Sequence, residues 1–385
     1  DMVIKTRGSG FIVGRGTANA YYRFMTFDGG KIIVTDKDKQ HWVVDEAVVI
    51  APARPHGCIT VFEVPFGQND FWENIEDRSY RGTIEISVVD QKLSVINVIG
   101  LEEYLYGVVR AEMPATWPLE ALKAQAVAAR SETMAKLGRH RKEGFDLCAN
   151  VHCQVYAGVG KETRASNLAV DQTRGQVLQY DGRPVDAVYS SNCGGHTQEN
   201  VFSKRGVAYF KGTPDMPEAG APGFPLSPLQ LEQWLKAPGP GIYCDLASSG
   251  RSSNFRWVRL YSAQELRSMV SQILDIGAIR SLKVARRNPS GHIAALAIIG
   301  EKGELILEQE LKIRSVLGNL RSSMFKVEVR YGKGGKAEQF VFYGGGWGHG
   351  VGMCQAGCRG MALAGKEYSQ ILGHYYASTQ MKKLY

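Results

Sequence analysis

The sequence has no long hydrophobic run. No apolar stretch approaches the roughly 20 residues that a membrane-spanning helix needs. Hydrophobic residues make up 44% of the 385-residue chain, an ordinary share for a folded protein. The chain begins at Asp1 rather than at an initiator methionine, and we interpret it as a mature chain whose export signal has been removed. Its length allows two or three domain-sized units.

Motifs for nucleic acids and nucleotides are also absent. The sequence contains no zinc-finger, RNP or KH signature, and its basic residues are scattered although the formal net charge is +8. The glycine-rich segment 344–352 matches neither GxGxxG nor Walker A. We therefore expect no nucleic-acid partner. The net positive charge favours polyanionic partners in general.

The sequence contains only seven cysteines, which is an odd number. Cys148 and Cys153 lie on an expected loop, with His152 adjacent and His140 upstream. Thiolates and imidazoles at this spacing can bind zinc. A local disulfide or two unlinked buried thiols are the alternatives.

Other cysteines carry weaker metal signals. Cys193 and His196, in a small-residue loop, are additional possible ligands. Cys354 and Cys358 are four residues apart on an expected helix that starts near Met353. That spacing favours buried packing over a metal site for the last two thiols.

The segment 101–138 contains the longest helical pattern of the sequence, which begins after Pro114. A strand at 93–98 leads into it, and a helix is expected from the N-cap Thr116 to the stop at Gly138. Glu112 should lie in a short turn before this helix, between apolar neighbours. A carboxyl group held against apolar surface can keep a proton near neutral pH and serve as a general acid. The alternative is a helix-flanking glutamate that faces water or caps backbone N–H groups.

Four segments, at 101–131, 146–158, 190–197 and 344–376, together resemble the SpoIID/LytB family, and the resemblance extends over roughly residues 81–385. The family implies a peptidoglycan lytic transglycosylase, and its catalytic acid falls on Glu112. Ala111 stands where the family commonly has serine. Some members of the family are similar in binding zinc through cysteines of this loop. If zinc binds here, we expect Cys148, Cys153 and His140 as its ligands and a structural role that orders the loop beside Glu112.

The resemblance implies a set of cleft residues. The expected substrate-binding residues are His152, Gln154, Tyr189, Ser191, Gly194, Gly195, Thr197, Trp347, His349 and Gln355. Glycines permit close backbone approach, and an aromatic ring can stack on a sugar face. These residue types suit a glycan strand.

The implied reaction cleaves the bond between N-acetylmuramic acid (MurNAc) and N-acetylglucosamine (GlcNAc) and leaves a 1,6-anhydromuramic end, with strands lacking stem peptides as a possible preferred substrate. Asp146, Asp186 and Glu199 are candidates for a second carboxylate, which would favour hydrolysis instead. One alternative function is a non-catalytic wall-binding or amidase-enhancing protein. Another is a zinc hydrolase that uses Cys148, Cys153 and a histidine.

These patterns predict an α+β fold, with mixed helices and β-sheets around a catalytic cleft. The expected organisation is a β-rich segment 1–53, the catalytic core in two parts at 58–210 and 331–385, and an insertion or second α+β subdomain at 211–330. A linker is expected at 51–55, a helix over 166–179 and an irregular segment at 211–240. Further along the chain we expect a helix at 263–274 that Ser262 caps, followed by a β meander over 281–311. The expected location is extracytoplasmic, facing the cell wall, with glycan strands and an amidase as candidate partners.

Overall fold

The computed structural model describes residues 2–17, 20–67, 73–199, 207–246 and 254–385. About 26% of the chain is helical and 35% is strand, which confirms the α+β class. The chain divides into two compact units. Unit 1 contains Asp1–Thr116, Thr133–Gly175 and Tyr385, and unit 2 contains Trp117–Glu132 and Gln176–Leu384.

Antiparallel sheets make up the first part of unit 1. A five-stranded sheet has the order β10-β9-β6-β1-β2, a three-stranded sheet the order β3-β4-β5, and β7 pairs with β8. The predicted linker at 51–55 is partly wrong, because β6 continues to Pro52. The strands are β1 (Met2–Thr6), β2 (Ile12–Gly16), β3 (Tyr22–Phe27), β4 (Lys31–Asp36), β5 (His41–Val44), β6 (Val48–Pro52), β7 (Ile59–Phe66), β8 (Asn74–Tyr80), β9 (Thr83–Val89) and β10 (Lys92–Val98).

The helix α1 (Leu101–Glu112) follows β10 directly. Leu105, Val108 and Val109 are fully buried and recur at helical spacing. The prediction that Glu112 lies in a short turn is therefore wrong, because Glu112 is the last residue of α1.

A capping box between Thr163 and Ser166 begins α3 (Arg164–Gln172). The predicted helix over 166–179 is wrong in its second half. Gly175 adopts a left-handed φ of 72°, and the chain then enters strand β11 (Gln176–Tyr180). A positive φ stops a right-handed helix, and glycine adopts it without strain.

The long predicted helix is confirmed as α2 (Leu119–Lys136). Its small residues are buried around more than one side, since Ala124, Ala126, Ala128 and Ala129 all have no exposed surface. Gly138 adopts a φ of 79° just after the helix ends. Residues of α2 up to Glu132 belong to unit 2, and those from Thr133 belong to unit 1.

The two larger antiparallel sheets of unit 2 are three-stranded and have the orders β14-β19-β18 and β15-β16-β17. The predicted meander over residues 281–311 is confirmed by β15, β16 and β17. Smaller pairings join β11 with β12 and β21, and β13 with β20. The remaining strands of unit 2 are β12 (Arg183–Pro184), β13 (Tyr189–Ser190), β14 (Arg256–Ser262), β15 (Ile279–Arg287), β16 (Ile293–Gly300), β17 (Glu304–Glu308), β18 (Phe325–Tyr331), β19 (Ala337–Gly345), β20 (Met353–Cys354) and β21 (Gln380–Lys383).

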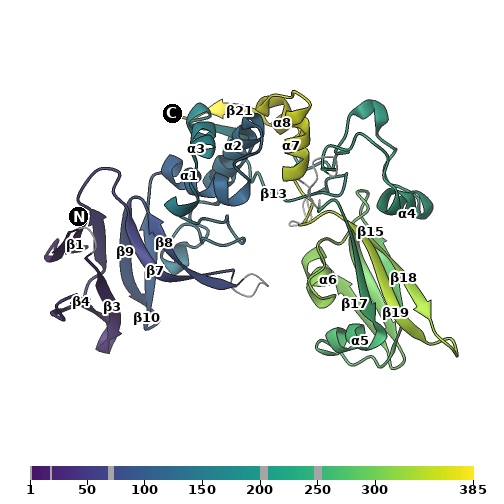
Figure 1. The fold of residues 1–385 in the computed structure, drawn as a ribbon, viewed down its shortest axis with the longest axis horizontal. Coiled ribbons are helices and arrows are strands. Elements are labelled where there is room, and N and C mark those ends of the chain that lie inside the picture. The colour runs from purple at the N-terminus through teal and green to yellow at the C-terminus, as the bar shows by residue number, and fades with distance from the viewer. Residues whose placement is uncertain (1, 18–19, 68–72, 200–206, 247–253) are drawn as a thin grey trace. The chain divides into compact units, whose positions relative to one another are not determined.

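One hydrophobic core joins the two larger sheets of unit 2 to α5 (Ala263–Ser271) and α6 (Glu310–Val316). Figure 1 shows both helices beside these strands. The predicted Ser262 cap of α5 is confirmed as a capping box with Glu265, although the helix ends before the expected Leu274. Burial on this scale is the main stabilising term for such a unit.

The segment 211–240, predicted as irregular, contains one helix that the proline and glycine content obscured. Ser227 and Gln230 form a capping box that begins α4 (Pro228–Lys236). Pro228 lies in its first turn, where its missing N–H costs little. The last two helices of unit 2 are α7 (Gln355–Leu363) and α8 (Tyr368–Tyr375).

Candidate active site and thiol clusters

Glu112 is partly exposed at the C-terminal end of α1, next to the buried Met113. The helix dipole disfavours a carboxylate at this end by up to ~1 kcal/mol. A hydrogen bond offsets that penalty, because the backbone N–H of Val155 donates to Glu112 Oε1 at 3.0 Å. The Val155 amide thus fixes the side chain in one position.

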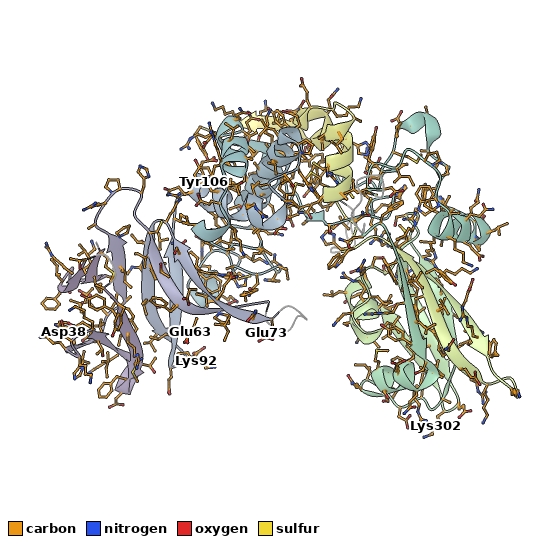
Figure 2. The ribbon with its side chains drawn as sticks, in the orientation of Figure 1. Asp38, Glu63, Glu73, Lys92, Tyr106 and Lys302 are labelled. Atoms are coloured by element: carbon orange, nitrogen blue, oxygen red, sulfur yellow. The ribbon has the colours of Figure 1, made fainter. Side chains whose placement is uncertain are left out.

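The helix that carries Glu112 is held on two sides within unit 1. Tyr106, labelled in Figure 2, donates its hydroxyl to Asp171 Oδ1 on α3 at 2.6 Å. A side chain at Gly107 would place its Cβ only 2.7 Å from the ring of Tyr156. Glycine therefore allows the segment after Cys153 to pack directly against α1.

Four potential metal ligands gather on the loop that follows α2. His140, Cys148, His152 and Cys153, here called the loop cluster, offer ligand atoms that all lie within 4.8 Å of one another. Cys153 Sγ lies 3.5 Å from His140 Nε2 and 3.9 Å from His152 Nδ1. Cys148 Sγ lies 3.8 Å from His152 Nδ1. Two thiols and two imidazoles form a donor set that fits zinc.

The two histidines of the loop cluster have different partners. His140 Nδ1 lies 3.0 Å from Glu143 Oε1, so a proton on Nδ1 leaves Nε2 free to face the thiols, as in many carboxylate–histidine–metal arrangements. His152 Nε2 lies 2.9 Å from the guanidinium of Arg139, which can only donate. The proton of a neutral His152 ring is then on Nδ1, so ligation through Nδ1 would require that proton to be on Nε2, the nitrogen that faces Arg139. Burial, followed by the charge of Arg139, lowers the pKa of His152.

Of the expected substrate-binding residues in unit 1, His152 is exposed and belongs to the loop cluster. Gln154 is only 3% exposed, and its Oε1 accepts from Thr133 Oγ1 at 3.4 Å. Asp146, a candidate second carboxylate, is exposed in unit 1, whereas Asp186 and Glu199 lie in unit 2. The remaining expected substrate-binding residues all belong to unit 2.

Strand β13 and the loop after it contain five expected substrate-binding residues. Tyr189 and Ser191 are partly exposed, whereas Gly194, Gly195 and Thr197 are buried. A Cβ at Gly195 would lie 2.4 Å from Trp234, so the glycine allows close packing inside unit 2. Gly194 carbonyl oxygen accepts from Trp234 Nε1 at 3.1 Å. This glycine pair contributes to packing in addition to any role in binding.

Three further expected binding residues follow β19. Trp347 and His349 are partly exposed, and the guanidinium of Arg321 lies 5.2 Å from the Trp347 ring centroid. Gln355 is 7% exposed, and its Nε2 donates to Gln125 Oε1 at 3.4 Å. Trp347 and His349 thus retain surface that a ligand can contact.

A second group of ligands, the buried cluster, lies within unit 2. It consists of Cys193, Asp215, Cys244 and Cys354, whose ligand atoms all lie within 4.8 Å of one another. Sequence reasoning named Cys193 as a possible ligand and assigned Cys354 to packing, and it missed Asp215 and Cys244. No spacing signal connects these residues, because Cys193 and Cys354 are 161 positions apart.

Two residues considered with them lie outside the buried cluster. His196 Nδ1 is 2.7 Å from the Thr197 carbonyl oxygen, and burial lowers the pKa of His196 to about 4. Cys358 Sγ donates to the Ala121 carbonyl oxygen at 3.7 Å. Among the described residues, the loop cluster and the buried cluster are the two groups with metal-ligand geometry.

Residues 89–180 match the family model described as Stage II sporulation protein, and residues 230–352 match a domain of unknown function. The first match includes Glu112 and the whole loop cluster. Several relatives resemble most of the chain. Stage II sporulation protein D of Bacillus subtilis is 29% identical over 301 residues, or 74% of this chain and 75% of that protein. An uncharacterized protein of Brachyspira hyodysenteriae is 29% identical over 300 residues, or 77% of this chain and 70% of that protein.

The Amidase enhancer of Bacillus subtilis is 31% identical over 296 residues. This match covers 72% of the chain but only 40% of the enhancer. Among the described residues, none of the helices is both long enough and apolar enough to cross a bilayer.

Proposed function

Because the chain belongs to the SpoIID/LytB family, we propose that it acts on the bacterial cell wall as a lytic transglycosylase with Glu112 as general acid and base. One observation carries the assignment to this residue. Glu112 ends α1 inside the family-matched segment 89–180, and the Val155 N–H holds its carboxyl group at 3.0 Å. A carboxyl group fixed in this way meets the positioning requirement of a general acid.

The proposed reaction needs a single carboxyl group. Protonated Glu112 gives its proton to the glycosidic oxygen as the MurNAc C1–oxygen bond breaks, and GlcNAc leaves with that proton. The MurNAc C6 hydroxyl then attacks C1, and the carboxylate takes the hydroxyl proton. The new C1–O6 bond forms the 1,6-anhydro ring and Glu112 is protonated again. General acid–base catalysis of this kind contributes about 100- to 10,000-fold in rate.

The loop cluster supports this mechanism indirectly, through the loop that holds Glu112. Cys153 lies two residues before Val155, whose N–H fixes Glu112. Zinc bound by His140, Cys148, Cys153 and His152 would anchor this loop as a structural centre. Four protein donors fill a tetrahedral site, whereas a zinc hydrolase keeps one position for water. The donor set therefore favours a structural role over zinc hydrolysis.

The proposed substrate is a peptidoglycan glycan strand, with strands lacking stem peptides as the preferred form. Trp347, His349, Tyr189 and Ser191 offer partly exposed aromatic and polar groups suited to sugars. The site of action is extracytoplasmic. We expect no nucleic-acid partner.

A second candidate function rests on the relative named Amidase enhancer. In that case the chain binds wall glycan and stimulates a cell-wall amidase without cleaving the strand itself. Cleavage by the purified chain separates the two functions.

The test is mass spectrometry of glycan strands, with and without stem peptides, after incubation with the wild type and with Glu112→Gln. Anhydromuramic products from the wild type should fall at least about 100-fold in the variant. Glu103→Gln, on the same helix, is the matched control and should cleave like the wild type. If folded wild-type protein binds strands and produces no fragments, the amidase-enhancing function replaces the enzyme.

A further inference from the structure

We propose that the buried cluster is a second metal centre, a structural zinc site formed by Cys193, Asp215, Cys244 and Cys354. This inference is independent of glycan cleavage. All four side chains have no exposed surface. They come from four separate places in the sequence of unit 2 and converge within 4.8 Å.

The distances suit tetrahedral zinc. Two sulfur atoms bound at ~2.3 Å to one tetrahedral ion lie about 3.8 Å apart. Cys193 Sγ and Cys244 Sγ are separated by 3.9 Å. A disulfide needs a separation of about 2.0 Å, and it would use two of the three thiols and leave the third beside a buried carboxyl group. The spacing therefore favours a shared ion.

Asp215 supplies independent evidence for a ligand at this position. Its Oδ1 accepts from the Tyr375 hydroxyl at 2.5 Å. Within the described part of the chain, its buried Oδ2 has no hydrogen-bond partner. A buried carboxylate without full compensation is costly, and coordination to a cation removes that cost.

The backbone around Cys354 is arranged for a thiolate. The N–H groups of Cys193 and Gly357 donate to Cys354 Sγ at 3.2 and 3.3 Å. Cys354 is also the N-cap of α7, so its sulfur lies at the positive end of the helix dipole. Thiolate is the form that binds metal.

Positive charge lies near the other two thiols. The guanidinium of Arg256 is partly buried and interacts electrostatically with Cys244 and Cys193. Its NH1 donates to the Gly194 carbonyl oxygen at 3.1 Å, one residue beyond Cys193. This arginine partly balances the excess negative charge of three thiolates and one carboxylate around a divalent ion.

The centre would fasten two irregular segments to the rest of unit 2. Asp215 N donates to the Gly195 carbonyl oxygen at 2.9 Å, and Tyr243 N donates to the Asp215 carbonyl oxygen at 2.8 Å. Asn192 Nδ2 donates to the Cys244 carbonyl oxygen at 3.0 Å. These bonds bring the ligand-bearing loops together without a regular strand between them. A structural ion supplies cohesion that hydrophobic packing does not provide there.

The test counts zinc by elemental mass spectrometry in the full chain, purified without chelators, and compares variants with the wild type. Cys244→Ser should lose one equivalent of zinc per chain. Cys358→Ser, which removes a buried thiol outside the cluster, should lose none. If Cys244→Ser does not fold, the Cys148→Ser/Cys153→Ser variant replaces it, because it removes the loop cluster and should retain one equivalent.

Cobalt substitution of that second variant adds a direct view of the ligands. A tetrahedral cobalt spectrum with sulfur-to-cobalt charge transfer is expected. The proposal is overturned if folded Cys148→Ser/Cys153→Ser protein holds neither zinc nor cobalt. It is equally overturned if peptide mapping of the wild type finds a disulfide between any two of Cys193, Cys244 and Cys354.

Discussion

The loop cluster and the buried cluster contain similar ligands in opposite settings. The loop cluster spans 13 positions of one surface loop, and only Cys153 is buried among its four residues. The buried cluster spans 161 positions and has no exposed side chain. With zinc bound as proposed, the first arrangement would order a local segment next to Glu112, whereas the second would join distant parts of unit 2. Similar ligands therefore lie beside the candidate catalytic residue in one cluster and inside unit 2 in the other.

Removing one thiol from each cluster should produce the largest contrast. Cys193→Ser should lower the free energy of unfolding by about 3 to 5 kcal/mol, because buried charged ligands lose a partner. Cys148→Ser should lower the free energy of unfolding by only about 1 kcal/mol, because its loop is at the surface. Urea unfolding monitored by tryptophan fluorescence measures both changes. The exposed Cys58 gives the baseline through Cys58→Ser, and equal losses in the two clusters would remove the distinction.

Packing around the buried cluster gives a second, smaller contrast. A Cβ at Gly357 would lie 2.2 Å from both Asp215 Oδ1 and the Tyr375 hydroxyl. Gly357→Ala should therefore destabilise the protein by about 1 to 3 kcal/mol in thermal unfolding. Gly373→Ala is the matched control in the neighbouring helix α8, where no heavy atom lies within 4 Å.

The control should raise stability by up to ~1 kcal/mol, because alanine has the higher helix propensity. If Gly357→Ala were as stable as Gly373→Ala, the buried cluster would be loosely packed. Rigid placement of Asp215 would then be ruled out.

The smallest contrast is expected between the two histidines of the loop cluster, in how far their replacement weakens zinc binding. His140→Gln should weaken zinc binding about 10- to 100-fold, because His140 has Glu143 as a supporting carboxylate. His152→Gln should weaken it less, since Arg139 competes for that ring. Competition with a chromogenic chelator measures both affinities, and the exposed His56 provides the control His56→Gln. The reverse order would show that Arg139 does not oppose ligation.

Much of this fold is visible in short patterns of the sequence. Alternating residues predicted the early strands, and small apolar residues at helical spacing predicted α2. The helix α1 was missed because the segment around Glu112 was assigned to a turn, although Leu105, Val108 and Val109 have helical spacing. In α4, the Ser227–Gln230 capping box was hidden among prolines and glycines. A local sequence pattern does not reveal its helix where a neighbouring pattern indicates a turn or an irregular segment.

The two clusters show the same limit for sites. Cys148, Cys153 and His140 were named as ligands because they are close in sequence. Asp215 and Cys244 carry no local sign of their role, since tertiary folding alone brings them to Cys193 and Cys354. For the candidate substrate residues, burial separates Gly194, Gly195 and Thr197 from the more exposed Trp347 and His349. Sequence patterns do not show which of these candidate residues are buried.

The most direct test of the proposed chemistry is glycan cleavage in water enriched with heavy oxygen, with the products weighed by mass spectrometry. Intramolecular attack by the MurNAc C6 hydroxyl predicts anhydromuramic ends that contain no oxygen from solvent. Reducing ends that carry one heavy oxygen atom would contradict lytic transglycosylation, because water would then be the nucleophile. Hydrolysis of that kind would require a second carboxylate to act with Glu112.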